Sequence, residues 1–137
     1  MNDCLFCRIA NKEIPAHIIC EDKDCVAFLD INPHSMGHSV VISKSHSENI
    51  LDIEDKELQN LFLTVKKTTA LLQKSLNPDG FTIGINHGEI AGQAVKHLHV
   101  HILPRYKNDK GGSIHSVVLS SSEKTVEEVK EIIKKNS

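Results

Sequence analysis

The 137-residue sequence contains no tryptophan, one tyrosine and four phenylalanines, and its formal net charge is −2 at pH 7. Without a basic excess or a stripe of basic and aromatic residues, nothing in the composition favours binding to nucleic acid. No apolar run approaches the roughly 20 residues that span a bilayer. The N-terminal sequence MNDCLFCRIANKEIP is too polar for a signal peptide. These absences predict a cytoplasmic protein that binds neither nucleic acid nor membranes.

The length and the four cysteines predict one domain, residues 1–137, that folds without disulfides. A chain of this size buries enough surface to be stable without cross-links, and cytoplasmic thiols stay reduced. Cys20 and Cys25 lie in or beside apolar runs, which predicts small buried side chains. Cys4 and Cys7 instead form a C-x-x-C pair, a moderate signal for metal binding in a reducing compartment.

Hydrophobic periodicity predicts an α+β fold with an antiparallel sheet of about five strands. Six apolar residues between Leu58 and Leu76 recur at helical spacing, and the sequence Asn77-Pro78-Asp79-Gly80 stops this long central helix. Residues 123–135 predict an amphipathic C-terminal helix. The strands do not alternate regularly with helices, which excludes a parallel βαβ sheet. A short helix is predicted at residues 5–12, and strands at 17–21, 26–30, 39–42, 81–86 and 97–103.

The most informative segment is residues 97–103, His-Leu-His-Val-His-Ile-Leu. Successive side chains of a strand point to opposite faces, so three histidines would line one face and three apolar residues would face a core. Imidazoles titrate near pH 6.5. Two kinds of site fit this arrangement. The histidines could ligate a metal ion, or a neutral imidazole could attack a phosphate and form a covalent intermediate.

The loop before this strand favours attack on phosphate. Residues 86–94 read Asn-His-Gly-Glu-Ile-Ala-Gly-Gln-Ala. Gly92 allows the backbone to approach a ligand, and the amides that follow it can donate hydrogen bonds to phosphate oxygens. The side chains of Asn86 and Gln93 add amide donors. Donors placed in this way stabilise charge that develops on a phosphoryl group.

Together these residues resemble the histidine triad (HIT) superfamily, most closely its Hint-like branch of nucleotide-binding proteins. The resemblance covers about residues 4–106 and leaves 107–137 as a C-terminal extension. The pair Gly37-His38 is one of the segments that carry the resemblance. The other segments that carry it are Cys4-Leu5-Phe6-Cys7, Lys12-Glu13-Ile14-Pro15, Ala27-Phe28-Leu29-Asp30-Ile31, Lys44-Ser45-His46, Asn86, Gly92-Gln93 and HLHVHILPR.

The resemblance implies a HIT-like fold and a homodimer that forms a covalent nucleotidyl-histidine. By position, His99 matches the nucleophile and His101 the residue that hydrogen-bonds the α-phosphate and the leaving group. His97 and His38 match histidines that orient the nucleophile, and Asp30 matches the acid that holds the ribose hydroxyls. The apolar walls of the nucleoside pocket match Phe6, Ile9, Ile14, Phe28 and Ile31. The phosphate loop matches Asn86, Gly92, Gln93 and the backbone of Ala94.

Two features qualify the resemblance and one extends it. Ala94 stands where many relatives carry serine or threonine, so one hydroxyl donor to phosphate is missing. The tail after Arg105 does not match the animal enzymes, which leaves the leaving group undefined. In bacterial-type relatives the C-x-x-C pair binds structural zinc with two histidines, which here match His46 and His97. The competing ligand set is Cys4, Cys7, Cys20 and Cys25, and the remaining alternative is a cysteine pair that binds no metal.

The implied activity is hydrolysis of purine nucleoside 5′-phosphoramidates or adenylylated amines to a nucleoside monophosphate, with no catalytic metal. Dimerisation is expected through the central helix and the strand at residues 81–86. Three alternatives remain: hydrolysis of dinucleoside polyphosphates, a non-catalytic nucleotide-binding regulatory module, and an enzyme that uses the triad to ligate a catalytic metal.

Overall fold

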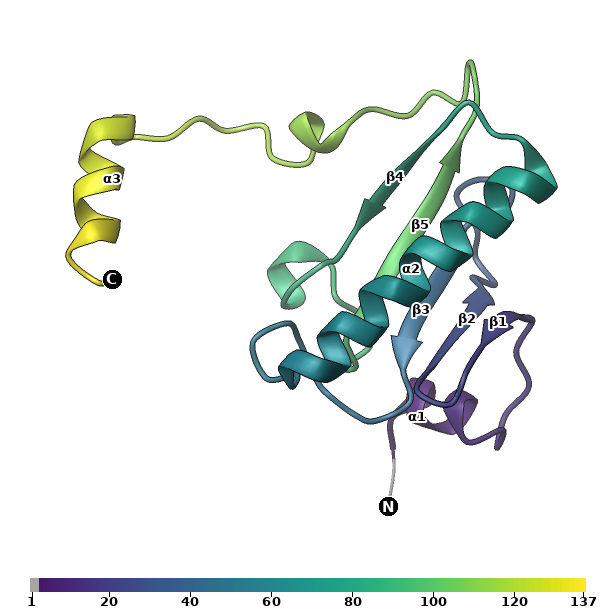
Figure 1. Cartoon of the computed structure of the whole chain (residues 1–137). Helices are drawn as coiled ribbons and strands as arrows, with labels where there is room; N and C mark the ends of the chain where they lie inside the picture. Colours follow the sequence, from purple (N-terminus) through teal and green to yellow (C-terminus); the bar gives the residue numbers. More distant parts are fainter. Residues whose placement is uncertain (1–2) are drawn as a thin grey trace.

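The computed structural model describes residues 3–137 and contains a five-stranded antiparallel sheet of order β1-β2-β3-β5-β4 (Figure 1). This arrangement confirms the predicted α+β class. The elements are α1 (Leu5–Ala10), β1 (Ile18–Glu21), β2 (Cys25–Leu29), β3 (Ser39–Ser43), α2 (Asp55–Leu76), β4 (Gly80–Gly84), the 3₁₀ turn η1 (Glu89–Ala91), β5 (His99–Arg105), the 3₁₀ turn η2 (Ile114–Ser116) and α3 (Val126–Lys134).

The two faces of the sheet carry different layers. The long helix α2 crosses one face, where Val41, Leu61, Leu98, Val100 and Ile102 form the buried core. The opposite face packs against the short helix α1 through a second apolar cluster of Phe6, Ile9, Ala10, Val26, Phe28, Val40 and Ile42. Because α1 covers only part of that face, side chains of β3 and β5 remain available there to build a site.

The structure corrects several predicted boundaries. The histidine strand begins at His99 rather than at residue 97 and continues to Arg105. Leu98 instead donates its backbone N–H to the Ser47 carbonyl, outside the ladder. The strand predicted at residues 81–86 is β4, which ends at Gly84. The first helix ends at Ala10, and Lys12 then adopts a positive φ of 62°, which a helix cannot continue.

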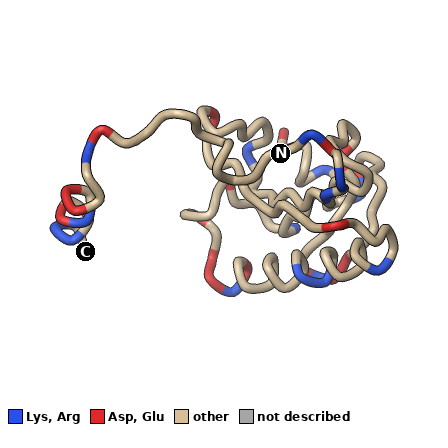
Figure 2. Tube along the Cα trace, turned by 90° about the horizontal axis from the view of Figure 1, so that it is seen from above, with Lys and Arg blue, Asp and Glu red and all other residues tan. Residues whose placement is uncertain are grey.

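The predicted C-terminal helix forms as α3, with a capping box between Thr125 and Glu128. It stands away from the sheet at the end of an extended arm, residues 107–125, as both views show (Figures 1 and 2). Figure 2 also shows that acidic and basic residues are interspersed along α2 and α3, with neither sign gathered on one side. None of the helices within residues 3–137 has the length and apolarity to cross a membrane.

Candidate active site and metal centre

The three histidines lie on the sheet face that α1 partly covers. In the antiparallel register, His99 is opposite Ile42 and His101 is opposite Val40, both of which belong to the α1-side cluster. Leu98, Val100 and Ile102 belong to the core beneath α2. The predicted alternation of histidine and apolar residues is therefore confirmed. It extends one step before the strand, because the His97 ring also packs on the α1 side, against Phe6.

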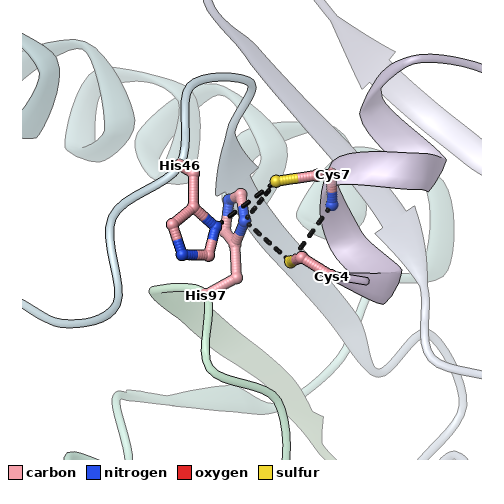
Figure 3. Close-up of side chains that lie close together, drawn as sticks. All are labelled: Cys4, Cys7, His46 and His97. Atoms are coloured by element: carbon pink, nitrogen blue, oxygen red, sulfur yellow. Dashed lines mark hydrogen bonds between the residues drawn. The ribbon is translucent and has the colours of Figure 1, made fainter. Parts of the chain in front are cut away.

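His97 is fully buried, and its two ring nitrogens have different partners, of which Figure 3 shows the two cysteines that face Nδ1. Its Nε2 lies 2.8 Å from the Ser43 carbonyl oxygen, which can only accept, so Nε2 carries the hydrogen. Its Nδ1 lies 3.4 Å from the sulfur atoms of both Cys4 and Cys7. The His46 Nδ1 lies 3.3 Å from the Cys7 sulfur. All four ligand atoms are within 4.8 Å of one another.

This cluster fits a structural zinc ion. Tetrahedral Zn²⁺, with Zn–S near 2.3 Å and Zn–N near 2.0–2.1 Å, places neighbouring sulfur and nitrogen atoms about 3.5 Å apart. The three sulfur–nitrogen distances here are 3.3–3.4 Å. The Nε2–H bond from His97 to the Ser43 carbonyl leaves the Nδ1 lone pair directed at the thiols, and a metal-binding histidine typically has one ring nitrogen held by a carbonyl in this way. The alternative ligand set of four cysteines does not fit, because the buried Cys25 belongs to the core beneath α2, on the other face of the sheet.

Helix α1 joins this cluster to the rest of the face. Cys4 caps the helix by accepting the Cys7 backbone N–H at 3.4 Å. Phe6, between the two cysteines, packs edge-on against the rings of His99 at 5.0 Å and Phe28 at 5.5 Å between centroids. The helix that carries Cys4 and Cys7 into the cysteine–histidine cluster therefore also positions an aromatic ring against the middle histidine.

His99 is held in one tautomer by the backbone. Its Nδ1 lies 2.7 Å from the His97 carbonyl oxygen, so Nδ1 carries the hydrogen and Nε2 has the lone pair. Burial lowers the pKa of His99 below its usual value. The ring is therefore neutral near pH 7, with an available nitrogen, which is the state that a nucleophilic histidine requires.

His38 and His101 form a second hydrogen-bonded pair at the other end of the row. The His34 backbone N–H donates to His38 Nδ1 at 3.2 Å, so a neutral His38 carries its hydrogen on Nε2. That Nε2–H donates to His101 Nδ1 at 2.9 Å. His101 consequently carries its own hydrogen on Nε2, as a donor. Asp30 Oδ2 lies 3.6 Å from His38 Nε2, too far for a strong hydrogen bond.

Burial is the main cause that keeps these rings neutral. Together with smaller contributions from neighbouring histidines, burial lowers the pKa of both His97 and His101 to about 4, and it lowers the pKa of His38 below its usual value. The charge of Asp30 opposes this effect at His38 and at His101 without reversing it. Neutral rings are what the tautomer pattern above requires, so the hydrogen bonds and the pKa directions agree.

A cavity of about 550 Å³ opens beside His99 and His101. Of the residues predicted to bind a nucleotide, it is lined by Phe6, Ile9, Ile14, Phe28, Asp30, Ile31, Asn86, Gly92 and Ala94. His38 also lines it, whereas His97 does not. Ile31 is the most exposed of these apolar residues, with 81% of its surface open to solvent. The structure thus brings the predicted apolar, acidic and loop residues to one cavity.

Gln93 is the member of the predicted set that does not line the cavity. Its Oε1 accepts the Gly88 backbone N–H at 2.9 Å, and its Nε2 donates to the carbonyls of Glu48 and Val95. The nearly buried side chain therefore holds the loop in shape. Gly92 has a φ of +102°, which only glycine adopts readily, and its N–H closes the turn on Glu89.

Sequence reasoning missed several cavity residues and backbone groups. His34 is exposed and no motif marked it, but its backbone N–H donates to Nδ1 of His38 and sets the tautomer of that ring. The Ser43 carbonyl, which orients His97, gave no sequence signal because backbone groups have none. The other lining residues that were not predicted are Leu5, Pro15, Ala16, Leu29, Asn32, Val40 and Val95.

The comparisons with known proteins place this site in a family. The model of the HIT domain matches residues 11–108. An uncharacterized HIT-like protein of Methanocaldococcus jannaschii is 47% identical over 120 residues, covering 85% of this chain and 92% of that protein. The adenosine 5′-monophosphoramidase of Schizosaccharomyces pombe is 36% identical over 108 residues, covering 79% of this chain and 78% of the enzyme.

A solved structure gives the same result. The crystal structure of a HIT-family protein from Bacillus subtilis superposes with a TM-score of 0.86 at 33% identity, over 98% of this chain and 95% of the other. The family includes hydrolases that act on nucleotides, as the phosphoramidase shows. On the agreement of domain match, relatives and fold, the chain belongs to the HIT family.

Proposed function

We propose that the protein hydrolyses purine nucleoside 5′-phosphoramidates or adenylylated amines to a nucleoside monophosphate, through a nucleotidyl group on His99. The observation that carries this proposal is the buried His99 ring beside the cavity, with its Nδ1–H fixed on the His97 carbonyl. Because of that bond, Nε2 is the ring nitrogen that keeps a lone pair for nucleophilic attack. The similarity to a phosphoramidase favours the same substrate class.

In the first step, His99 Nε2 forms a bond to the α-phosphorus while the phosphorus–nitrogen bond breaks. The leaving nitrogen, protonated in the substrate, departs as a neutral amine. The positive charge that develops on the His99 ring is stabilised by the Nδ1–H bond to the His97 carbonyl. His101 Nε2–H, oriented through His38, donates to the phosphoryl oxygen, or to the amine nitrogen once the phosphorus–nitrogen bond has broken.

In the second step, water attacks the phosphorus, the bond to His99 breaks, and Nε2 regains its lone pair. The water proton passes to solvent, and the nucleoside monophosphate leaves. Each step is a displacement at phosphorus in which the protein positions the groups and stabilises charge. In this mechanism no metal takes part in the chemistry.

The nucleotide is assigned to the cavity by its lining. The apolar side chains of Phe6, Ile9, Ile14, Phe28 and Ile31 would enclose the purine, and Asp30 would accept hydrogen bonds from the ribose hydroxyls. The α-phosphate would lie beside Asn86, Gly92 and Ala94. Among the loop amides within residues 3–137, those of Gly92 and Gln93 bond within the turn, whereas that of Ala94 has no acceptor in the chain. Gln93 would act by supporting this loop.

We further propose that Cys4, Cys7, His46 and His97 hold one structural zinc ion per chain. The distances above support this assignment, and the ion would fix α1 and the His97 ring. The other group of possible ligands, Asp30, His38 and His101, supports metal binding less well. Both nitrogens of His38 are already engaged in hydrogen bonds there.

Two copies of the chain would form a homodimer through α2 and β4. This face presents an apolar groove that includes Phe62, Val65, Ala70, Phe81 and Ile83. Phe62 and Ile83 are each 42% exposed, and β4 is an edge strand with unpaired backbone groups. Covering such an edge protects it from unspecific pairing.

The deciding experiment compares steady-state hydrolysis of adenosine 5′-phosphoramidate and diadenosine tetraphosphate, with and without brief EDTA treatment. We expect far faster cleavage of the phosphoramidate, insensitivity to EDTA, and a radiolabelled nucleotidyl-protein when the reaction is quenched in alkaline detergent, in which a phosphorus–nitrogen bond to histidine survives. Faster cleavage of the tetraphosphate would instead assign the protein to hydrolysis of dinucleoside polyphosphates. Tight nucleotide binding without turnover would favour a non-catalytic binding module. Activity that is lost on EDTA treatment and restored by Fe²⁺ or Mn²⁺ would favour a metal-dependent enzyme.

A further inference from the structure

The cysteine–histidine cluster, Cys4, Cys7, His46 and His97, has one side open to solvent. The His46 ring is exposed and Cys4 is half-buried, whereas Cys7 and His97 are buried. The two sulfur atoms lie within 4.8 Å of each other, and Figure 3 shows both turned toward the His97 ring. A small dissolved oxidant can therefore reach the Cys4 sulfur from solvent, with the buried Cys7 sulfur beside it.

The C-x-x-C spacing suits oxidation to a disulfide. Cys4 precedes α1 and Cys7 lies in its first turn, so one turn of helix keeps the two side chains close. Dithiols with this spacing are the redox-active pairs of thioredoxin-like proteins. Cys20 and Cys25 instead pack with the core beneath α2. Oxidation confined to the cluster would therefore link Cys4 to Cys7.

The cluster contacts the proposed nucleophile at two points. The Phe6 ring, between the two cysteines in the sequence, lies 5.0 Å from the His99 ring between centroids and lines the cavity. The His97 carbonyl accepts the His99 Nδ1–H at 2.7 Å, while the His97 ring faces both sulfur atoms. A change at the sulfur atoms can therefore reach His99 through one aromatic side chain and one backbone carbonyl.

We propose that Cys4 and Cys7 are an oxidation site: hydrogen peroxide joins them in a disulfide, which releases the proposed zinc ion and weakens nucleotide binding in the cavity. The inference rests on the proposed zinc ion and on the proposed nucleotide site. It adds to them a modification that controls both.

The oxidation has two steps. The Cys4 thiolate attacks one peroxide oxygen and the oxygen–oxygen bond breaks, which gives a sulfenic acid and hydroxide. The Cys7 thiolate then forms the sulfur–sulfur bond and displaces a second hydroxide from Cys4. The two thiolates lose two electrons, peroxide gains them, and two protons from solvent convert both hydroxides to water.

The loss of the metal follows from the number of ligands. A structural zinc ion takes four, with cysteine bound as thiolate, and the disulfide leaves only His46 and His97. Helix α1 has six residues, far fewer than the roughly 12–15 that an isolated helix needs, so its position depends on its attachments. Once the metal has left, a nucleotide must order Phe6 as it binds, and that ordering costs affinity.

The first test titrates the reduced, zinc-loaded full chain with hydrogen peroxide. Released zinc is measured with a chromogenic chelator, the disulfide by peptide mass spectrometry, and AMP binding by calorimetry. We expect one zinc ion per Cys4–Cys7 disulfide and a dissociation constant for AMP that rises at least about fivefold. Dithiothreitol with added zinc should reverse both changes. The matched control Cys20→Ser should respond as the wild type does.

Two results of this titration would overturn the proposal. One is zinc that stays bound while peroxide oxidises other residues, such as the exposed Met36. The other is zinc release with unchanged AMP affinity. A loss of affinity that dithiothreitol and zinc do not reverse would also count against it, because the disulfide is the reversible product.

The second test uses the reciprocity of coupled binding. Saturating AMP should raise the affinity for zinc, measured by competition with a chelator, by the same factor by which zinc raises the affinity for AMP. Phe6→Leu keeps both cysteines but removes the aromatic contact with His99, and it should reduce this factor while retaining the metal. A zinc affinity that AMP does not change in the wild type would overturn the coupling.

These outcomes separate the inference from the proposals beneath it. A wild type purified without chelator and without zinc would overturn the inference together with the zinc assignment. Reduced protein that does not bind AMP would overturn it together with the nucleotide site. Zinc and AMP that bind independently of each other would overturn the inference alone. None of these measurements depends on hydrolysis.

Discussion

The two ends of the histidine row use the same side chain for opposite purposes. At one end, His97 Nδ1 faces two thiols and its Nε2–H is bound to the Ser43 carbonyl, in a fully buried site. At the other end, His101 Nδ1 accepts from His38, and its Nε2–H remains available beside the cavity. His99 lies between them with Nδ1–H on a carbonyl.

This comparison shows that the partner of Nδ1 decides what each ring can do. A lone pair that faces thiols suits the proposed metal ligand, a donated Nδ1–H suits the proposed nucleophile at Nε2, and an accepting Nδ1 leaves a donor at Nε2. Spacing in the sequence places the rings in a row, but neighbours from α1, β3 and the loop before β3 assign their roles. Substituting those neighbours should therefore weaken the distinct properties of the histidines at the two ends of the row.

The largest effect should come from the middle of the row. His99→Ala removes the proposed nucleophile, and we expect kcat for adenosine 5′-phosphoramidate to fall at least about 10³-fold. His17→Ala, which changes an exposed histidine that does not line the cavity, should leave kcat unchanged. If His99→Ala keeps more than a tenth of the activity, the triad is not used for covalent catalysis.

The thiol end should respond in metal content and stability. Cys7→Ser removes a proposed ligand, and we expect the zinc content to fall from about one ion per chain to none. The free energy of unfolding should drop by at least about 3 kcal/mol, because binding of a structural metal is coupled to folding. Plasma emission spectrometry and urea unfolding measure both. Cys20→Ser is the matched control and should keep its metal; a wild type purified without chelator and without zinc would contradict the assignment.

The cavity end should respond in catalysis. His38→Leu removes the donor that fixes the tautomer of His101. We expect kcat to fall roughly 10–100-fold, the range typical of lost orienting partners, with little change in KM. His38→Gln retains an N–H donor and should recover part of the loss. A rise in KM without a change in kcat would instead mean that His38 only shapes the cavity.

The same end should make stability depend on pH. Burial keeps the folded-state pKa of His101 near 4, although Asp30 opposes the shift, while His99, His38 and His34 add to it. The unfolded chain therefore binds more protons between pH 6.5 and pH 4, and stability falls as pH is lowered through that window. In His101→Gln the slope should be shallower by up to about 1.4 kcal/mol per pH unit. Urea unfolding from pH 4 to 7 measures it, and identical slopes would refute the assignment.

The smallest effect should be at the ribose. Asp30→Asn keeps the shape of the side chain but weakens it as an acceptor for hydroxyls, and we expect KM to rise about tenfold with kcat nearly unchanged. Removing the 2′-hydroxyl from the substrate should raise KM less for this variant than for the wild type. Equal losses would show that Asp30 does not contact that hydroxyl.

Much of this molecule was accessible from the sequence because its signals are local. Alternation between His97 and Ile102 predicted which side chains face the core, and the helical period from Leu58 to Leu76 predicted α2. Spacing alone could not join the proposed metal ligands, since Cys7 and His97 are 90 positions apart, and only the family resemblance put them in one set before the fold brought them together. The tautomers were out of reach, because the Ser43 carbonyl and the His34 N–H are backbone groups that no residue type reveals.

The order of the strands has a consequence for synthesis on the ribosome. β5 is the last strand to be made, yet it lies between β3 and β4, and it carries both His99 and His101. Until β5 emerges, β3 and β4 have no strand between them to pair with. The nascent chain therefore has neither a complete sheet nor a histidine row. Such a chain exposes strand edges while it waits. We therefore expect a product truncated before Arg105 to lack the proposed hydrolase activity and to aggregate more readily than the full chain.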